Sequence, residues 1–281
     1  MAVRGTSTVA SGDLAGSATA VRGAGSSAQF QYAAPIDGLR AVSILAVVAY
    51  HVGVPGVPGG FIGVDIFFVI SGFLIINQIK AALSSGQFST FSFYAQRALR
   101  ILPPYLIVLL ATCAVAPFFV STTAEYWDFF ASATLAPLMV TNVLFYLTQG
   151  YFDISAIEKP LLHTWTLSVE EQFYLLAPIL LVLVFRLGNR RFGFPAAIFG
   201  IVLLALSLTG AITHTFAAGR NPAFYLPQWR AWEFLIGGFI GAQLIEEIRR
   251  LPRAFTEIAG CLGAACIGIA IATFNESTPP R

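Results

Sequence analysis

Charged residues are scarce in this 281-residue chain, because Asp, Glu, Lys and Arg together make up only 11% of it. A soluble domain carries roughly 25% of such residues. Hydrophobic residues make up 57% of the chain, so an ordinary water-soluble globular protein is excluded. The 16 basic and 14 acidic residues nearly cancel, to a net charge of +2. The chain therefore also lacks the basic surface that a nucleic-acid partner requires.

Cysteine is also rare, with three residues in the whole chain: Cys113, Cys261 and Cys266. Each lies inside an apolar run, and their spacing is not that of metal ligands. We interpret them as small apolar packing residues and expect no metal in this protein.

The first 34 residues lack the apolar core of about 7 to 15 residues that a cleaved signal peptide contains. They are rich in Ser, Gly, Ala and Thr instead. We therefore predict a disordered cytoplasmic tail over residues 1–34, followed by a membrane domain over residues 35–281.

Long apolar runs fill the rest of the chain, at about residues 41–58, 60–79, 101–120, 128–147, 167–187, 195–216, 231–245 and 254–274. A transmembrane helix needs about 20 apolar residues. Because Lys and Arg concentrate in cytoplasmic loops, seven of these runs fit as spans with the N-terminus in the cytoplasm. The run 128–147 contains Pro137 and Asn142, and counting it as a span would place Arg190 and Arg191 outside. We predict an all-α, polytopic bundle in the plasma membrane, with about seven spans and 128–147 interfacial or re-entrant.

The first apolar run carries Arg40 and His51 eleven residues apart, which places them on one helix face about 16 Å apart. If Arg40 lies at the inner interface, His51 lies beyond the middle of the bilayer, where an ionisable group indicates function. Asp65 begins the next run at a similar depth and predicts a carboxylate partner for His51. The alternative is a structural histidine that bonds a neighbouring carbonyl, or a shorter helix whose histidine reaches the outer surface.

Arg97 and Arg100 stand three residues apart on the inner side of the next run. Two guanidinium groups on one helix face are suited to binding phosphate. Arginines that merely anchor a span to anionic lipid are the alternative interpretation.

Two further polar groups are predicted on the outer side. His163 stands seven residues before Glu170, on one face of a helix that begins early enough, and Glu171 adds a second carboxylate. Arg230 and Glu233 stand three residues apart near the end of another run. Such a pair neutralises itself or binds a polar acceptor.

The strings IDGLRAVSILAVVAYH, GGFIGVDIFFVISGFLI, RALRILPPY, HTWTLSVEEQFYLLAP and RAWEFLIG, taken in this order, resemble the acyltransferase 3 family of membrane acyltransferases over about residues 35–245. The resemblance implies transfer of an acyl group, most often acetyl, from cytoplasmic acyl-CoA to a hydroxyl of an extracytoplasmic glycan. Members similar to this chain have about ten spans, so we expect its membrane domain to be C-terminally incomplete.

The resemblance also implies roles for the polar residues. The catalytic set is His51, Asp65 and Glu170, and the donor-binding set is Arg40, Arg97 and Arg100. The residue types and predicted outer position of a third set, and not the resemblance, favour acceptor binding by His163, Glu171, Arg230 and Glu233. His51 is expected to act as general base, and the carboxylates to orient it. The competing interpretations are a proton-coupled transporter or flippase of a glycolipid, in which these groups form a proton relay, and an inactive truncated relative.

Overall fold

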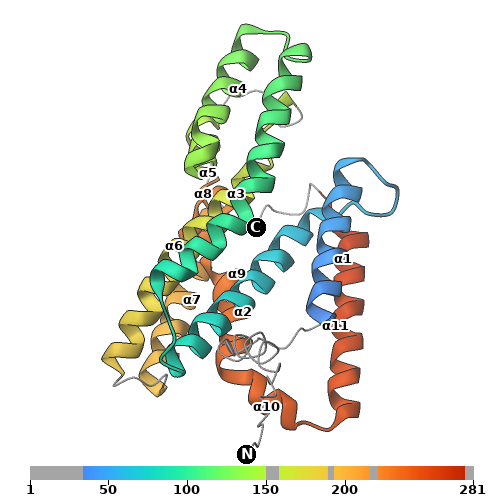
Figure 1. Ribbon diagram of the computed structural model, residues 1–281. Helices are drawn as coiled ribbons and strands as arrows, with labels where there is room; N and C mark the ends of the chain where they lie inside the picture. Colours follow the sequence, from blue (N-terminus) through green and yellow to red (C-terminus); the bar gives the residue numbers. More distant parts are fainter. Residues whose placement is uncertain (1–33, 150–157, 189–192, 216–220, 276–281) are drawn as a thin grey trace, which may run out of the picture. The chain divides into compact units, whose positions relative to one another are not determined.

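The computed structural model describes residues 34–149, 158–188, 193–215 and 221–275, and the regular elements within these ranges are all helical (Figure 1). The all-α prediction is therefore confirmed. Residues 1–33 of the predicted disordered tail lie outside the described residues.

The described residues contain a series of helical elements. They are α1 (Ala34–His51), η1 (Gly60–Ile62), α2 (Gly63–Ser84), α3 (Thr90–Val115), η2 (Ala116–Phe118), α4 (Thr123–Leu135), η3 (Ala136–Leu138), α5 (Thr141–Thr148), α6 (Thr164–Leu187), α7 (Phe194–Thr215), α8 (Pro222–Tyr225), α9 (Pro227–Phe239), the π-helical η5 (Ile240–Leu244), α10 (Ile245–Arg250) and α11 (Arg253–Thr273).

Five helical stretches in the described residues are long and apolar enough to cross a membrane: Gly60–Ser84, Thr90–Phe118, Thr164–Leu187, Ala196–Thr215 and Arg253–Thr273. The chain is thus a multi-pass membrane protein. The two other predicted spans are α1, which ends at His51 rather than at residue 58, and the run 231–245, which is divided between α9, η5 and α10. The count of seven spans and the cytoplasmic N-terminus stay predictions.

The run 128–147 does not form one continuous helix. Helix α4 ends in a short 3-10 turn, and Met139 then adopts a left-handed backbone conformation with φ of 54° before α5 begins. Polar contacts with α6 hold the break: Gln172 of α6 donates to the carbonyl of Met139 at 2.8 Å, and the Thr141 hydroxyl lies 2.9 Å from the buried Ser168 hydroxyl. A lipid-exposed break would leave backbone groups unsatisfied. The interfacial or re-entrant placement stays a prediction.

Helix α2 packs closely against α9 because glycines remove side chains at the contact. A Cβ at Gly72 would overlap the carbonyl oxygen of Phe234, and a Cβ at Gly237 would overlap that of Val69. Small residues allow helix backbones in membranes to approach in this way. The same principle applies between α1 and the start of α2, where Gly60 and Gly63 lie against the α1 backbone.

Candidate active site

A cavity of about 310 Å³ lies between α1, α2 and α6. Its wall is mostly apolar and includes Val47 of α1 and Phe67 and Phe68 of α2. Glu170 of α6 is the ionisable residue among those that line it. A largely apolar cavity with few polar groups is the usual form of a small-molecule site, and among the described lining residues Glu170 supplies the charge.

The Glu170 side chain is buried and firmly held. Its Oε1 accepts a hydrogen bond from the Ser71 hydroxyl at 2.5 Å and another from the Tyr174 hydroxyl. Ser71 comes from α2, whereas Tyr174 is one turn further along α6. Both hydrogen bonds fall on the same oxygen. Among the described residues, none donates a hydrogen bond to Oε2.

Arg97 of α3 contacts Tyr174, one of the two donors to Glu170. Its guanidinium lies 4.9 Å from the centre of the Tyr174 ring, and it donates a hydrogen bond of 3.1 Å to Gln78. Its charge also acts on Glu170 and Glu171. Arg100, three residues later, is exposed instead. The two arginines that were predicted to bind phosphate together therefore occupy different environments.

His51 is the last residue of α1 and is exposed. Its Nδ1 lies 2.8 Å from the carbonyl oxygen of Val47. A carbonyl can only accept, so Nδ1 carries the proton in the neutral ring and Nε2 is the basic nitrogen. Since Val47 also lines the cavity, His51 lies one helical turn beyond the cavity wall.

Asp65 is paired with Arg230 and not with His51. Arg230 Nη1 lies 2.7 Å from Asp65 Oδ1 and 2.5 Å from Glu233 Oε1, and its Nε donates to the carbonyl of Phe224. Arg230 and Glu233 are buried, with 4% and 0% of their side chains exposed. Among the described residues, His51 and Asp65 share no hydrogen bond. The hydrogen-bond partner of His51 is thus a carbonyl of its own helix, and not the Asp65 carboxylate that the sequence predicted.

The remaining sequence-predicted residues lie around the cavity without filling it. Arg40 lies 5.4 Å from the ring centre of Phe67, a residue of the cavity wall. His163 is exposed immediately before α6. Glu171 is half-buried, and no described residue forms a hydrogen bond with its Oε1. Among the described residues, no group of three His, Cys, Asp or Glu side chains is arranged to hold a metal.

Sequence reasoning missed Ser71 and Tyr174. Tyr174 follows Glu170 by four residues, a spacing that places two side chains on one helix face, so this pair was within reach of the sequence. Ser71 is 99 residues from Glu170, and nothing local connects the two.

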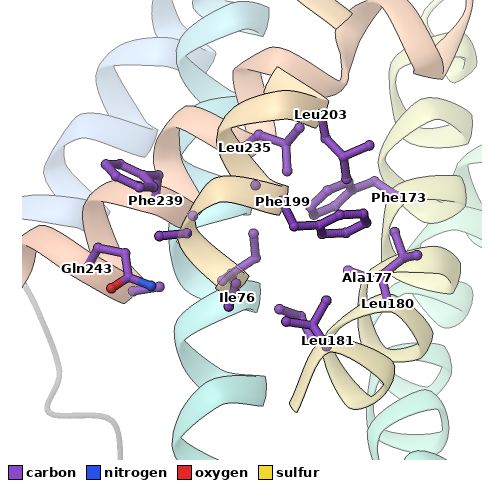
Figure 2. Close-up of a pocket in the computed structure, with 16 residues that line it drawn as sticks. Ile76, Phe173, Ala177, Leu180, Leu181, Phe199, Leu203, Leu235, Phe239 and Gln243 are labelled. Atoms are coloured by element: carbon purple, nitrogen blue, oxygen red, sulfur yellow. The ribbon is translucent and has the colours of Figure 1, made fainter. Parts of the chain in front are cut away.

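A second cavity, of about 110 Å³, lies between α2, α6, α7 and α9 (Figure 2). Figure 2 shows apolar side chains around most of it, with Gln243 at one edge. A stack of rings separates it from the first cavity: Phe234 packs against Phe173 on one side and Phe68 on the other, at centroid distances of 4.3 and 4.6 Å. None of the described residues that line it is ionisable.

Comparison with known proteins identifies relatives over most of the chain. The family model described as an acyltransferase domain matches residues 34–279. Peptidoglycan O-acetyltransferase OatA of Listeria monocytogenes is 30% identical over 260 residues, which cover 89% of this chain and 41% of that protein. O-acetyltransferase OatA of Staphylococcus aureus is 32% identical over 198 residues, which cover 69% of this chain and 32% of that protein.

An uncharacterized protein of Haemophilus influenzae is 37% identical over 182 residues, which cover 63% of this chain and 72% of that protein. The chain thus spans less than half the length of the two O-acetyltransferases, at 41% and 32%. No solved structure matches it.

Proposed function

The chain belongs to the acyltransferase domain family, and from that premise we propose that it transfers an acyl group, in the first instance acetyl, from acyl-CoA to a hydroxyl of an extracytoplasmic glycan. The O-acetyltransferase names of the Listeria and Staphylococcus relatives support acetyl as the group. The name of the Listeria relative makes peptidoglycan the first acceptor to test. The observation that carries the proposal is the cavity lined by Glu170, whose α1 wall ends one turn before His51.

The donor is proposed to bind at the end of the cavity nearer Arg40, with its phosphates on Arg40, Arg97 and Arg100. Guanidinium groups bind phosphate through paired, charge-assisted hydrogen bonds. Arg100 is exposed and so is the most accessible of the three. Arg97 has one hydrogen bond to Gln78 among the described residues, which leaves further N–H donors for a phosphate.

His51 is the proposed general base. As the acceptor oxygen attacks the thioester carbonyl carbon, Nε2 takes the hydroxyl proton, the C–S bond breaks, and the imidazolium returns the proton to the departing thiolate. Glu170, whose Oε2 accepts no hydrogen bond from the described residues, is the proposed carboxylate that stabilises the imidazolium. Asp65 is paired with Arg230, so its proposed influence on the site passes through this ion pair and not through contact with His51.

The proposed acceptor-side residues differ in accessibility. His163 is exposed and Glu171 is half-buried, so both are available to hydroxyl groups of a glycan. Arg230 and Glu233 are buried in their own ion pair. We propose that these two shape the acceptor side by holding α9 against α2 and do not bind the glycan directly.

The test is acetyl transfer by membranes that contain the full chain, from radiolabelled acetyl-CoA to purified peptidoglycan, followed as base-labile label. His51→Gln should lower the rate roughly 10²- to 10⁴-fold, the usual contribution of a general base. His214→Gln is the matched control, because His214 packs on the Trp229 ring at 4.9 Å in another part of the bundle. Arg100→Ala should raise the KM for acetyl-CoA and leave kcat unchanged.

Two results would contradict the proposal. One is the absence of transfer above membranes without the protein, which would favour a transporter or an inactive relative. The other is a rate for His51→Gln equal to that of His214→Gln at equal abundance, which would remove His51 from the mechanism.

A further inference from the structure

The polar contacts of Glu170 come from two helices and converge on one atom. Ser71 of α2 and Tyr174 of α6 both donate to Oε1. All three residues are buried, with 5%, 5% and 8% exposed for Ser71, Tyr174 and Glu170. Burying a carboxylate without hydrogen bonds costs much free energy. One donor would already give Oε1 a hydrogen bond, and this oxygen has two.

We propose that Ser71 and Tyr174 are positioning residues, which hold Glu170 so that Oε2 points to the cavity. The proposal rests on the proposed function, since it assigns a purpose to the orientation of Glu170. With Oε1 engaged by two donors, rotation of the carboxylate about its last bond breaks both hydrogen bonds. The oxygen without a donor among the described residues then remains as the one that reaches the cavity, where Glu170 is part of the lining.

The Tyr174 ring is itself fixed by contacts on α3. The guanidinium of Arg97 lies over its face at 4.9 Å, and cation–π contacts of this kind stabilise a ring when it is desolvated. Arg97 is in turn tied to Gln78 of α2. Side chains of three helices are therefore linked around the Tyr174 side chain. A tyrosine that only filled space would not need its hydroxyl aligned in this way.

The chain provides a matched control for the loss of a tyrosine hydroxyl. Tyr94 of α3 also donates to α6, at 2.7 Å, but to the backbone carbonyl of Leu175 and not to a carboxylate. Tyr94→Phe and Tyr174→Phe each remove one oxygen and one α6 hydrogen bond. Only the second variant alters the carboxylate.

The experiment measures acetyl transfer from labelled acetyl-CoA, with kcat and the donor KM determined separately. Tyr174→Phe and Ser71→Ala should each lower kcat roughly 10- to 100-fold, the range expected for a hydrogen bond to a charged group. The donor KM should stay within about twofold, because Oε1 does not touch the donor. Tyr94→Phe should retain wild-type kcat, and the thermal midpoints of all three variants in detergent distinguish a loss of kcat from a loss of folded protein.

A double-variant cycle separates positioning from general structure. In a Glu170→Met background, which has no carboxylate to orient, Tyr174→Phe should cause no further loss. An equal loss in both backgrounds would overturn the proposal, and so would full kcat in Tyr174→Phe and Ser71→Ala. Wild-type kcat in Glu170→Met alone would instead refute the proposed role of Glu170, which keeps the two failures distinguishable. If one hydroxyl variant fails to fold, the other still gives the result.

Discussion

Removing the cation of the buried ion cluster should be among the most damaging single changes in this chain. Arg230 binds Asp65 at 2.7 Å and Glu233 at 2.5 Å, and it faces the rings of Phe68 and Trp165 at 5.7 and 5.5 Å. Methionine matches much of its length and supplies no charge. Arg230→Met therefore leaves the two carboxylates without their common cation.

The expected cost follows from the burial of the two partners. Glu233 has no exposed side-chain area, whereas 20% of the Asp65 side chain is exposed. Removal of one member of a buried ion pair costs about 3 to 5 kcal/mol, because an uncompensated charge stays inside. Most of this cost should come from Glu233, since part of the Asp65 side chain is exposed and that of Glu233 is not. The double variant Arg230→Met with Glu233→Leu should therefore recover most of the loss.

Unfolding by titration with SDS, followed by tryptophan fluorescence, measures this cost. Trp165 lies against the Arg230 guanidinium and reports on the cluster. The control is Arg250→Met, because Arg250 pairs with Glu247 at the same i, i+3 spacing but with 74% and 66% of the two side chains exposed. An exposed pair is worth about 0 to 1 kcal/mol. Equal destabilisation by the two variants, or no recovery in the double variant, would refute the reasoning.

Three other predictions concern packing, pH and topology. Gly72→Ala should strongly lower the thermal midpoint, because the added Cβ would overlap the α9 backbone. Gly200→Ala is the control and should be neutral or slightly stabilising, because open space surrounds Gly200. Equal shifts of the two midpoints would contradict the close contact between α2 and α9. The backbone N–H of Ser121 holds the pKa of Glu125 below its ordinary value of 4.5. This cap is complete above that pH and is lost as pH falls through the lowered pKa, so amide exchange at Ser121, corrected for its intrinsic pH dependence, should accelerate only in acid. After removal of the native cysteines, single cysteines at Glu125 and Glu158 should both react with an impermeant reagent outside the cell; reaction of only one means that the segment between them crosses.

The local features of this protein could be read from the amino-acid sequence alone. Apolar runs of membrane-spanning length predicted helices, and the structure has helices there, because hydropathy and helix periodicity are properties of neighbouring residues. The i, i+3 spacing of Arg230 and Glu233 placed them on one face, where they form an ion pair.

Pairings between distant segments were decided only by the tertiary structure. Asp65 was expected beside His51, since both lie near the same end of consecutive apolar runs. It pairs instead with Arg230, 165 residues away, because the glycine contacts bring α9 against α2 and a buried guanidinium requires carboxylates. Ser71 reaches Glu170 across 99 residues for a similar reason. Spacing along one helix sets which side chains share a face. Only close packing between helices sets which faces meet. In a low-dielectric interior, the faces that meet decide which charges are paired.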